Sequence, residues 1–223
     1  MNYLQLNSFK KGNDFIKFQE GKFEVVFSTA ENNKSFNRNT EEGIKELEAL
    51  IDKFHGENVE YLKQIHSNKV YTYRKGSNDF KDNEGDALIT NEKKVIIGVF
   101  TADCVPVILV DKENEAIAAI HSGWKGTFSS IVTETILRMK EEYNSKAENI
   151  VAYIGPHIRQ CCYEVSEDLK EQFLKKFDIE KDKLFDGRNL SLEECINNDL
   201  INSGVLEENI HSLGLCTNCE KEV

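Results

Sequence analysis

The chain of 223 residues is long enough to bury one substantial hydrophobic core. Hydrophobic residues make up 39% and charged residues 30%, which excludes a disordered polymer. No apolar run approaches the roughly 20 residues that cross a bilayer, and a net charge of −11 argues against general nucleic-acid binding. The N-terminal segment MNYLQLNSFKKGNDF has no apolar leader, so we expect a cytoplasmic protein without membrane or nucleic-acid partners.

The first predicted elements are a strand, a helix and three further strands. Residues 23–29 predict a strand, and apolar residues at helical spacing predict a helix that ends near His55-Gly56. A strand over 59–73 is expected to carry His66, followed by short apolar strands over 86–90 and 95–100. These elements form the first half of a mixed fold.

Two apolar strands at 105–111 and 116–122 are separated by the turn-like segment KENE, which is typical of a hairpin. If Val110 faces Ala116, Cys104 lies opposite residue 121 or 122. The sequence leaves a choice between registers that differ by one residue. In either register the hairpin brings Cys104 and His121 together at its open end.

The second half is predicted to contain a helix over 127–143, a strand over 150–154, helices near 166–177 and 191–203, and a last strand over 209–215. Strands and helices intermix around at least one hairpin, and no linker divides the chain. We therefore expect one domain over 1–223, of the α/β class with a mixed sheet or of the α+β class.

Three residues have the chemistry of a catalytic zinc site, which takes three protein ligands and leaves one position open. Cys104 lies in the polar segment TADCVP between apolar strands, and His121 ends a strand at the turn HSGWKG. His66 supplies a third ligand. The alternative is a buried thiol with two hydrogen-bonded histidines.

Neighbouring residues supply candidates for substrate binding. Asp103 is either a turn residue or a carboxylate that moves a proton beside the metal. Lys125 and Gly126 precede a helix expected to start near Thr127, which favours either a phosphate site or a solvated turn. Trp124 is interpreted as a pocket wall or as core.

Arg159 follows a Gly-Pro turn together with His157, and both are candidates for the same pocket. The CxxC motif has no obvious matching partner, so its cysteines and the vicinal pair are expected to be free thiols without metal, a second structural zinc being the alternative. These cysteines are Cys161, Cys162, Cys216 and Cys219.

Five segments in order, LKQIHSNKV, GDALIT, GVFTADCVPVIL, AAIHSGWKGT and IGPHIRQCCYEV, resemble the signature blocks of the polyphenol oxidase (multicopper laccase-like) family. That family is understood as purine nucleoside phosphorylases with additional adenosine deaminase activity, and its metal ligands match His66, Cys104 and His121. The resemblance implies a zinc ion, with copper as the less favoured alternative, and a sandwich of mixed sheet packed against helices. It implies phosphorolysis of adenosine, inosine, guanosine and methylthioadenosine to free base and ribose 1-phosphate. We expect the protein to be a monomer or a homodimer.

The chain departs from the family pattern at Ala30 and Lys125, where family members usually have arginine, and no Phe-Ser-Tyr-Arg-Arg segment follows CTNC. In the mechanism that the resemblance implies, Lys125 would hold phosphate, and Asp103 or Glu164 would handle the leaving-group proton or steady the base. Zinc would lower the pKa of water for deamination.

Three other functions remain open at this point. A multicopper oxidase needs more imidazoles than the five histidines present. A cysteine hydrolase would use Cys104 as nucleophile and His121 as base, without metal. A binding module with structural zinc would close the fourth coordination position, for instance with Asp103.

Overall fold

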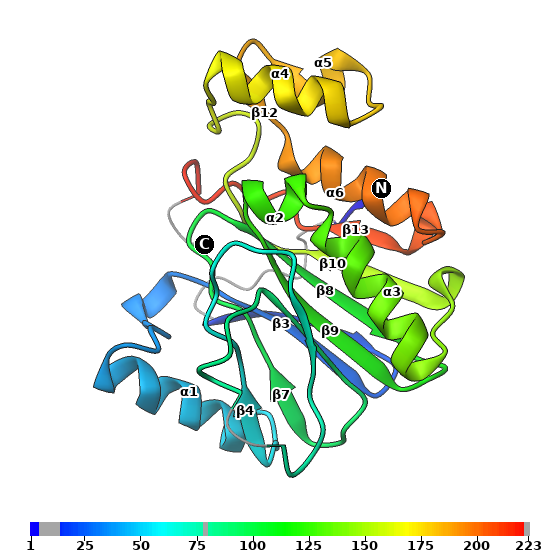
Figure 1. The fold of residues 1–223 in the computed structure, drawn as a ribbon. Helices are drawn as coiled ribbons and strands as arrows, with labels where there is room; N and C mark the ends of the chain where they lie inside the picture. Colours follow the sequence, from blue (N-terminus) through cyan, green and yellow to red (C-terminus); the bar gives the residue numbers. More distant parts are fainter. Residues whose placement is uncertain (5–13, 78–79, 221–223) are drawn as a thin grey trace.

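The computed structural model describes residues 1–4, 14–77 and 80–220, and a seven-stranded mixed sheet lies at its centre (Figure 1). The strand order is β1-β13-β10-β8-β9-β6-β5. The inner neighbours from β10 to β6 are antiparallel, whereas β1, β13 and β10 run parallel to one another, as do β5 and β6. The strands are β1 (Asn2–Tyr3), β5 (Val70–Thr72), β6 (Ala87–Thr90), β8 (Val105–Asp111), β9 (Ala116–Ser122), β10 (Ile150–Ile154) and β13 (Ile210–Ser212).

The β8–β9 hairpin has a different register from the one considered first. Val110 lies opposite Ile117, not Ala116, and Pro106 lies opposite His121. The reason is that paired residues of antiparallel strands share a face of the sheet. Val110 and Ile117 pack in one hydrophobic cluster, whereas Ala116 packs in the cluster on the opposite face.

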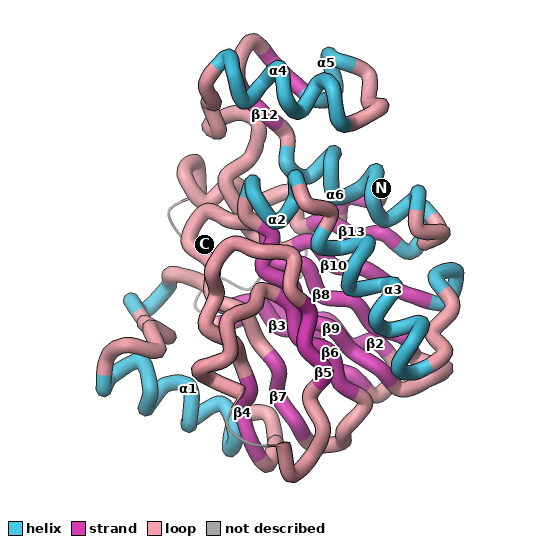
Figure 2. The backbone as a smooth tube through the Cα atoms, in the orientation of Figure 1, coloured by secondary structure: helices cyan, strands magenta, loops and turns pink. Residues whose placement is uncertain are grey.

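Helices cover one face of the sheet, as Figure 2 shows for α2, α3 and α6. Alternate residues of β8, namely Val105, Val107 and Leu109, join the main core with Ile131 and Ile136 of α3. A smaller helical layer with α4 and α5 lies beyond α6 in Figure 1. The bounds are α2 (Trp124–Phe128), α3 (Ile131–Tyr143), α4 (Glu167–Lys176), α5 (Lys181–Leu184) and α6 (Leu192–Asn202), with the short strands β11 (Phe185–Asp186) and β12 (Asn189–Leu190).

The opposite face is covered by the antiparallel hairpin of β2 and β3, whose Val25 and Phe27 pack against Val110 and Tyr153. A third unit, in which α1 packs beside the parallel pair β4 and β7, lies at the lower left of Figure 1. The remaining elements are β2 (Phe15–Glu20), β3 (Phe23–Ser28), η2 (Glu31–Asn33), α1 (Glu41–Lys53), β4 (Asn58–Glu60), β7 (Val95–Ile97), η3 (Ala147–Asn149) and η4 (Glu207–Asn209).

Two expected elements are each split in the structure. The strand predicted over 59–73 is interrupted between β4 and β5 by a loop in which His66 has a φ of +59°. The helix predicted over 127–143 is two helices, because Ser130 has a φ of +54° and ends the continuity between α2 and α3. Of the helices in the described residues, none is long and apolar enough to span a membrane.

Candidate metal centre

The three predicted ligands meet at one end of the β8–β9 hairpin. Cys104 immediately precedes β8, His121 lies in β9, and His66 reaches them from the loop between β4 and β5. The Cys104 Sγ and His66 Nε2 atoms are 3.8 Å apart, and the two imidazole centroids are 4.8 Å apart at 80°. The three ligand atoms all lie within 4.8 Å of one another. The structure therefore brings together the set that the sequence predicted.

Asp86, which directly precedes β6, anchors two of these ligands, and the sequence analysis did not identify it as a site residue. Its Oδ1 accepts hydrogen bonds from the His66 backbone N–H (2.9 Å) and from His121 Nδ1 (2.8 Å). Its Oδ2 accepts from the Ser67 N–H and hydroxyl at 2.6 and 2.7 Å. A carboxylate bound to the second ring nitrogen of a histidine ligand fixes its tautomer and orientation. The motif Gly-Asp-Ala before an apolar strand was the only available signal.

The buried Asp86–His121 pair is electrostatically strong. Burial alone would raise the pKa of Asp86, but hydrogen bonds from His121 and Ser67 hold it at about 2. Burial likewise opposes the charged form of His121, yet Asp86 and Cys104 raise its pKa to about 9. The pKa of His66 is lowered by burial and by the charges of His121 and Lys125, which favours the neutral imidazole that a metal requires.

Backbone geometry leaves little room around the ligands. A Cβ on Gly123 would lie 2.8 Å from His66 Cδ2 and 3.0 Å from Cys104 Sγ, so only glycine fits there without displacing them. His66 itself adopts the left-handed region, which costs a non-glycine residue free energy. The hydrogen bonds to Asp86 hold that loop conformation. Backbone strain that the surrounding contacts hold in place is typical of functional sites.

The donor set fits a zinc ion with an open coordination position. Two imidazoles and a thiolate are ligands that zinc accepts, and catalytic zinc keeps a fourth position for water or substrate. Within the described residues, no further His, Cys, Asp or Glu atom joins this group. The Asp103 carboxylate instead accepts a hydrogen bond from the Thr217 hydroxyl at 2.8 Å. The closed structural site considered from the sequence therefore lacks its expected fourth ligand.

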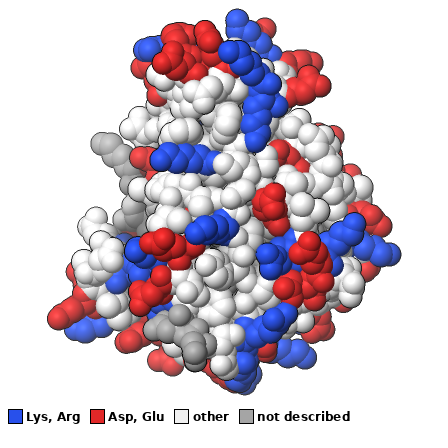
Figure 3. Space-filling view, in the orientation of Figure 1, with Lys and Arg blue, Asp and Glu red and all other residues white. Residues whose placement is uncertain are grey.

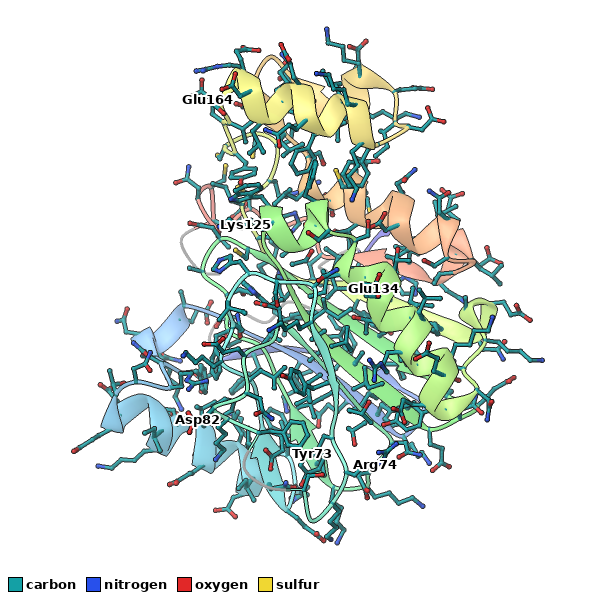
Figure 4. All side chains as sticks on the ribbon, viewed as in Figure 1. Tyr73, Arg74, Asp82, Lys125, Glu134 and Glu164 are labelled. Carbon is teal, nitrogen blue, oxygen red and sulfur yellow. The ribbon has the colours of Figure 1, made fainter. Side chains whose placement is uncertain are left out.

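The segment after Gly123 forms one wall beside the ligands. The helix was expected to start near Thr127, after Lys125 and Gly126. It starts at Trp124 instead, so both residues lie in its first turn. Lys125 is exposed and lies close enough to His66 to influence its pKa, while Gly126 is buried against the Ser67 carbonyl. Trp124 is half-buried and packs against the main core. Figure 4 shows Lys125 on this short helix, near the centre of the view.

Two other predicted site residues have partners elsewhere. Glu164 is exposed and pairs with Arg188, and Figure 4 places it beside α4, well above Lys125. Arg159 donates from its guanidinium to the buried Glu193 carboxylate at 3.0 Å and to the Gly214 carbonyl at 3.0 Å. Neither residue has a described contact with the three ligands. Tyr163, which the sequence analysis did not consider, is closer to the chemistry: burial and then the charge of Cys104 raise its pKa.

A cavity of about 1430 Å³ reaches the same region from the side of the β2–β3 hairpin. Among its lining residues are Thr101, Ala102 and Thr217, the last of which is hydrogen-bonded to Asp103. Among the described residues, the three ligands do not line it. The volume is ample for a nucleoside-sized molecule.

The charged surface carries no broad basic area on the face drawn in Figure 3, where Lys and Arg are interspersed with Asp and Glu.

Comparison with known proteins places the chain in a family. Residues 18–223 match the family described as multi-copper polyphenol oxidoreductase laccase, and the chain belongs to it. A purine nucleoside phosphorylase from Clostridium acetobutylicum is 45% identical over 93% of this chain and 86% of its own length. One from Aquifex aeolicus is 38% identical over 77% of each chain. The family expected from the sequence is confirmed.

Solved structures confirm the fold class. The Bacillus licheniformis hypothetical protein YfiH superposes with a TM-score of 0.79 at 22% identity, covering 89% of this chain and 84% of that one. A Neisseria meningitidis protein superposes with a TM-score of 0.78 at 24% identity, covering 94% and 90%. The predicted domain of mixed sheet and helices is the fold of these proteins.

A second group of thiols also converges in the structure. Cys161, Cys162, Cys216 and Cys219 have Sγ atoms that all lie within 4.8 Å of one another, and we call them the four-cysteine cluster. The interpretation that the CxxC motif has no matching partner is therefore wrong, because the vicinal pair provides one.

Proposed function

We propose that this chain is a purine nucleoside phosphorylase whose zinc ion is held by His66, Cys104 and His121. The observation that carries the proposal is this three-ligand cluster, which has no fourth ligand among the described residues, in a chain 45% identical to a protein named for that activity. Substrates would be adenosine, inosine, guanosine or methylthioadenosine with phosphate, and adenosine deamination would be a side activity. When bound, the zinc supplies a Lewis acid at the open position.

The chain's own residues supply the remaining functions. Phosphorolysis requires a cation for phosphate, and Lys125 is the exposed cation nearest in sequence to the ligand His121. Because Ala30 and Lys125 replace family arginines, Lys125 carries more of that task here. Asp103 would handle the proton of the leaving purine, since it adjoins Cys104 and is solvent-accessible. Tyr163, near Cys104, would form part of the base pocket.

One alternative has geometric support. Cys104, His121 and Asp86 lie in the order nucleophile, base and orienting carboxylate, because His121 interacts with Cys104 and also hydrogen-bonds Asp86. A cysteine hydrolase built this way would work without metal. Copper oxidase chemistry is disfavoured because, of the five histidines, only His66 and His121 belong to the cluster.

The test is chromatography of adenosine incubated with and without phosphate. We expect adenine and ribose 1-phosphate with phosphate, and slow formation of inosine without it. Both reactions should fall strongly in His121→Ala. Lys125→Ala should raise the apparent phosphate KM while largely sparing deamination, and Lys140→Ala, an exposed lysine of α3, is the matched control.

Three outcomes would count against the proposal. Equal loss of both reactions in Lys125→Ala would remove the phosphate role of that residue. No turnover of any purine nucleoside by folded, zinc-loaded protein would defeat the enzymatic assignment. Full activity after zinc is removed by a chelator would favour the cysteine hydrolase.

A further inference from the structure

The four-cysteine cluster is built from two segments that are far apart in sequence. Cys161 and Cys162 lie in a turn after β10, and Cys216 and Cys219 lie in a turn after β13. Because β10 and β13 are parallel neighbours, their following segments leave the sheet side by side. A parallel bridge between His157 and Cys216 continues that pairing beyond the strands.

The sulfur spacing is that of a mononuclear thiolate site. Cys219 Sγ lies 3.7 Å from Cys161 Sγ and 3.4 Å from Cys162 Sγ. Four sulfurs at about 2.3 Å from a tetrahedral zinc are about 3.8 Å from one another. A disulfide requires sulfurs at about 2.05 Å, and all six cysteines of the chain are free.

Packing alone does not explain why the thiols converge. Buried cysteine behaves as a small apolar residue, but Cys161 and Cys219 are exposed and so gain little from burial. Polar groups are directed at the sulfurs instead. The Arg159 backbone N–H donates to Cys216 Sγ at 3.5 Å, and Asn218 Nδ2 donates to Cys162 Sγ at 3.2 Å. Donors of this kind stabilise the negative charge of a ligating thiolate.

We propose that the four-cysteine cluster is a second, structural zinc site, distinct from the centre formed by His66, Cys104 and His121. All-thiolate tetrahedral sites select zinc or iron–sulfur clusters, and the close sulfur spacing favours a single ion. The four protein ligands close this site, so it carries out no chemistry on substrate. It goes beyond the proposed function, which requires only the first zinc.

The location of the cluster gives this second zinc a structural consequence. It joins residues 157–164 to residues 213–220, and both segments hold Asp103. The Ile158 N–H donates to the Asp103 carbonyl at 2.9 Å, and the Thr217 hydroxyl donates to the Asp103 carboxylate at 2.8 Å. Asp103 directly precedes the ligand Cys104. The second zinc therefore fixes one wall of the first metal centre.

Metal analysis of protein purified under reducing conditions tests the proposal. We expect about two zinc ions per chain in the wild type and about one in Cys219→Ser and in Cys104→Ala. Cys195→Ala is the control, because Cys195 is outside both metal clusters, and it should keep both ions. A wild type with a single zinc that Cys104→Ala removes, a Cys219→Ser protein that keeps both, or iron in place of zinc would overturn the proposal.

Alkylation of the wild type provides a test that does not depend on a variant folding. Cys161 and Cys219 are exposed, so iodoacetamide should modify them readily unless zinc occupies their sulfurs. We expect protection in the zinc-loaded protein and alkylation of both after chelation, located by mass spectrometry. Rapid modification in the zinc-loaded protein, or a Cys162–Cys219 disulfide in the reduced preparation, would show that the cluster does not bind zinc.

Discussion

Replacing Asp86 by asparagine tests whether this buried carboxylate organises the metal centre. Its Oδ1 accepts from the His66 N–H and His121 Nδ1, and its Oδ2 accepts from the Ser67 N–H and hydroxyl. The Ile65 N–H lies between the two oxygens, at 3.2 and 3.3 Å. An asparagine side chain has one oxygen and one NH₂ group. Whichever way it turns, the NH₂ group must face at least one N–H donor in a fully buried position.

The magnitude follows from the pKa and from the hydrogen bonds. The fall in the pKa of Asp86 from 3.8 to about 2 corresponds to about 2.5 kcal/mol of stability. Leaving one buried donor unsatisfied costs about 1–3 kcal/mol more. We therefore expect the free energy of unfolding of the metal-free protein to fall by about 3.5–5.5 kcal/mol. Zinc affinity should fall by about 10–100-fold, because the Asp86 carboxylate no longer holds His66 and His121 in the orientation that binds the metal.

The pH dependence of this stability difference has a definite sign. The folded pKa of Asp86 is depressed, so its contribution is present above pH 3.8 and is lost as the pH falls through about 2. The folded pKa of His121 is raised, so its contribution is complete below pH 6.5 and is lost as the pH rises through about 9. The difference in the free energy of unfolding between wild type and Asp86→Asn should therefore be largest between pH 3.8 and pH 6.5, where both contributions are complete.

Urea unfolding of the metal-free proteins gives the stability, and competition with a chromogenic chelator gives the zinc affinity. Asp111→Asn is the matched control, because Asp111 is also fully buried and accepts hydrogen bonds from Glu113 and Asn114 at the turn end of the hairpin. It should lose stability without losing zinc. An Asp86→Asn protein with wild-type zinc affinity would refute the orienting role.

Two further predictions concern packing at the ligands and a buried acid. Gly123→Ala should weaken zinc binding on the order of tenfold, because the added Cβ would displace His66 or Cys104. Gly98→Ala is the control and should keep its zinc affinity, because a Cβ there would have no atom within 4 Å. Equal zinc affinities of the two variants, measured by chelator competition, would contradict this reasoning. Asp199→Asn should stabilise the protein by about 1–3 kcal/mol well above pH 6, because burial raises the pKa of Asp199 to about 6 and its charged form destabilises the fold. This gain should shrink as the pH falls below 6 and vanish below about pH 3.8, where both side chains are neutral; a gain that persists in acid urea titrations would exclude this cause.

The sequence by itself determined the elements whose signals are local. The apolar alternation of β8 and β9 and the short turn between them fixed a hairpin, and with it the proximity of Cys104 and His121. The helix expected near 191–203 also followed from the sequence, and Ser191 accepts from the Glu194 N–H where α6 begins. The ordered sequence blocks determined the family and the expected ligands. Hydrogen bonding within a hairpin or a helix turn involves residues close in the chain, so the local sequence pattern is enough to predict these elements.

Only the tertiary structure decided the interactions that join distant segments. The four-cysteine cluster depends on β10 lying parallel to β13, and the loop conformation of His66 depends on the buried Asp86 carboxylate. Arg159 is a plausible phosphate ligand by its position in the chain, but Glu193 of α6 binds its guanidinium. Sequence periodicity reports which face of an element is buried and not which element covers it. The order of strands in the sheet, and therefore the partners of these residues, is set by packing across the whole chain.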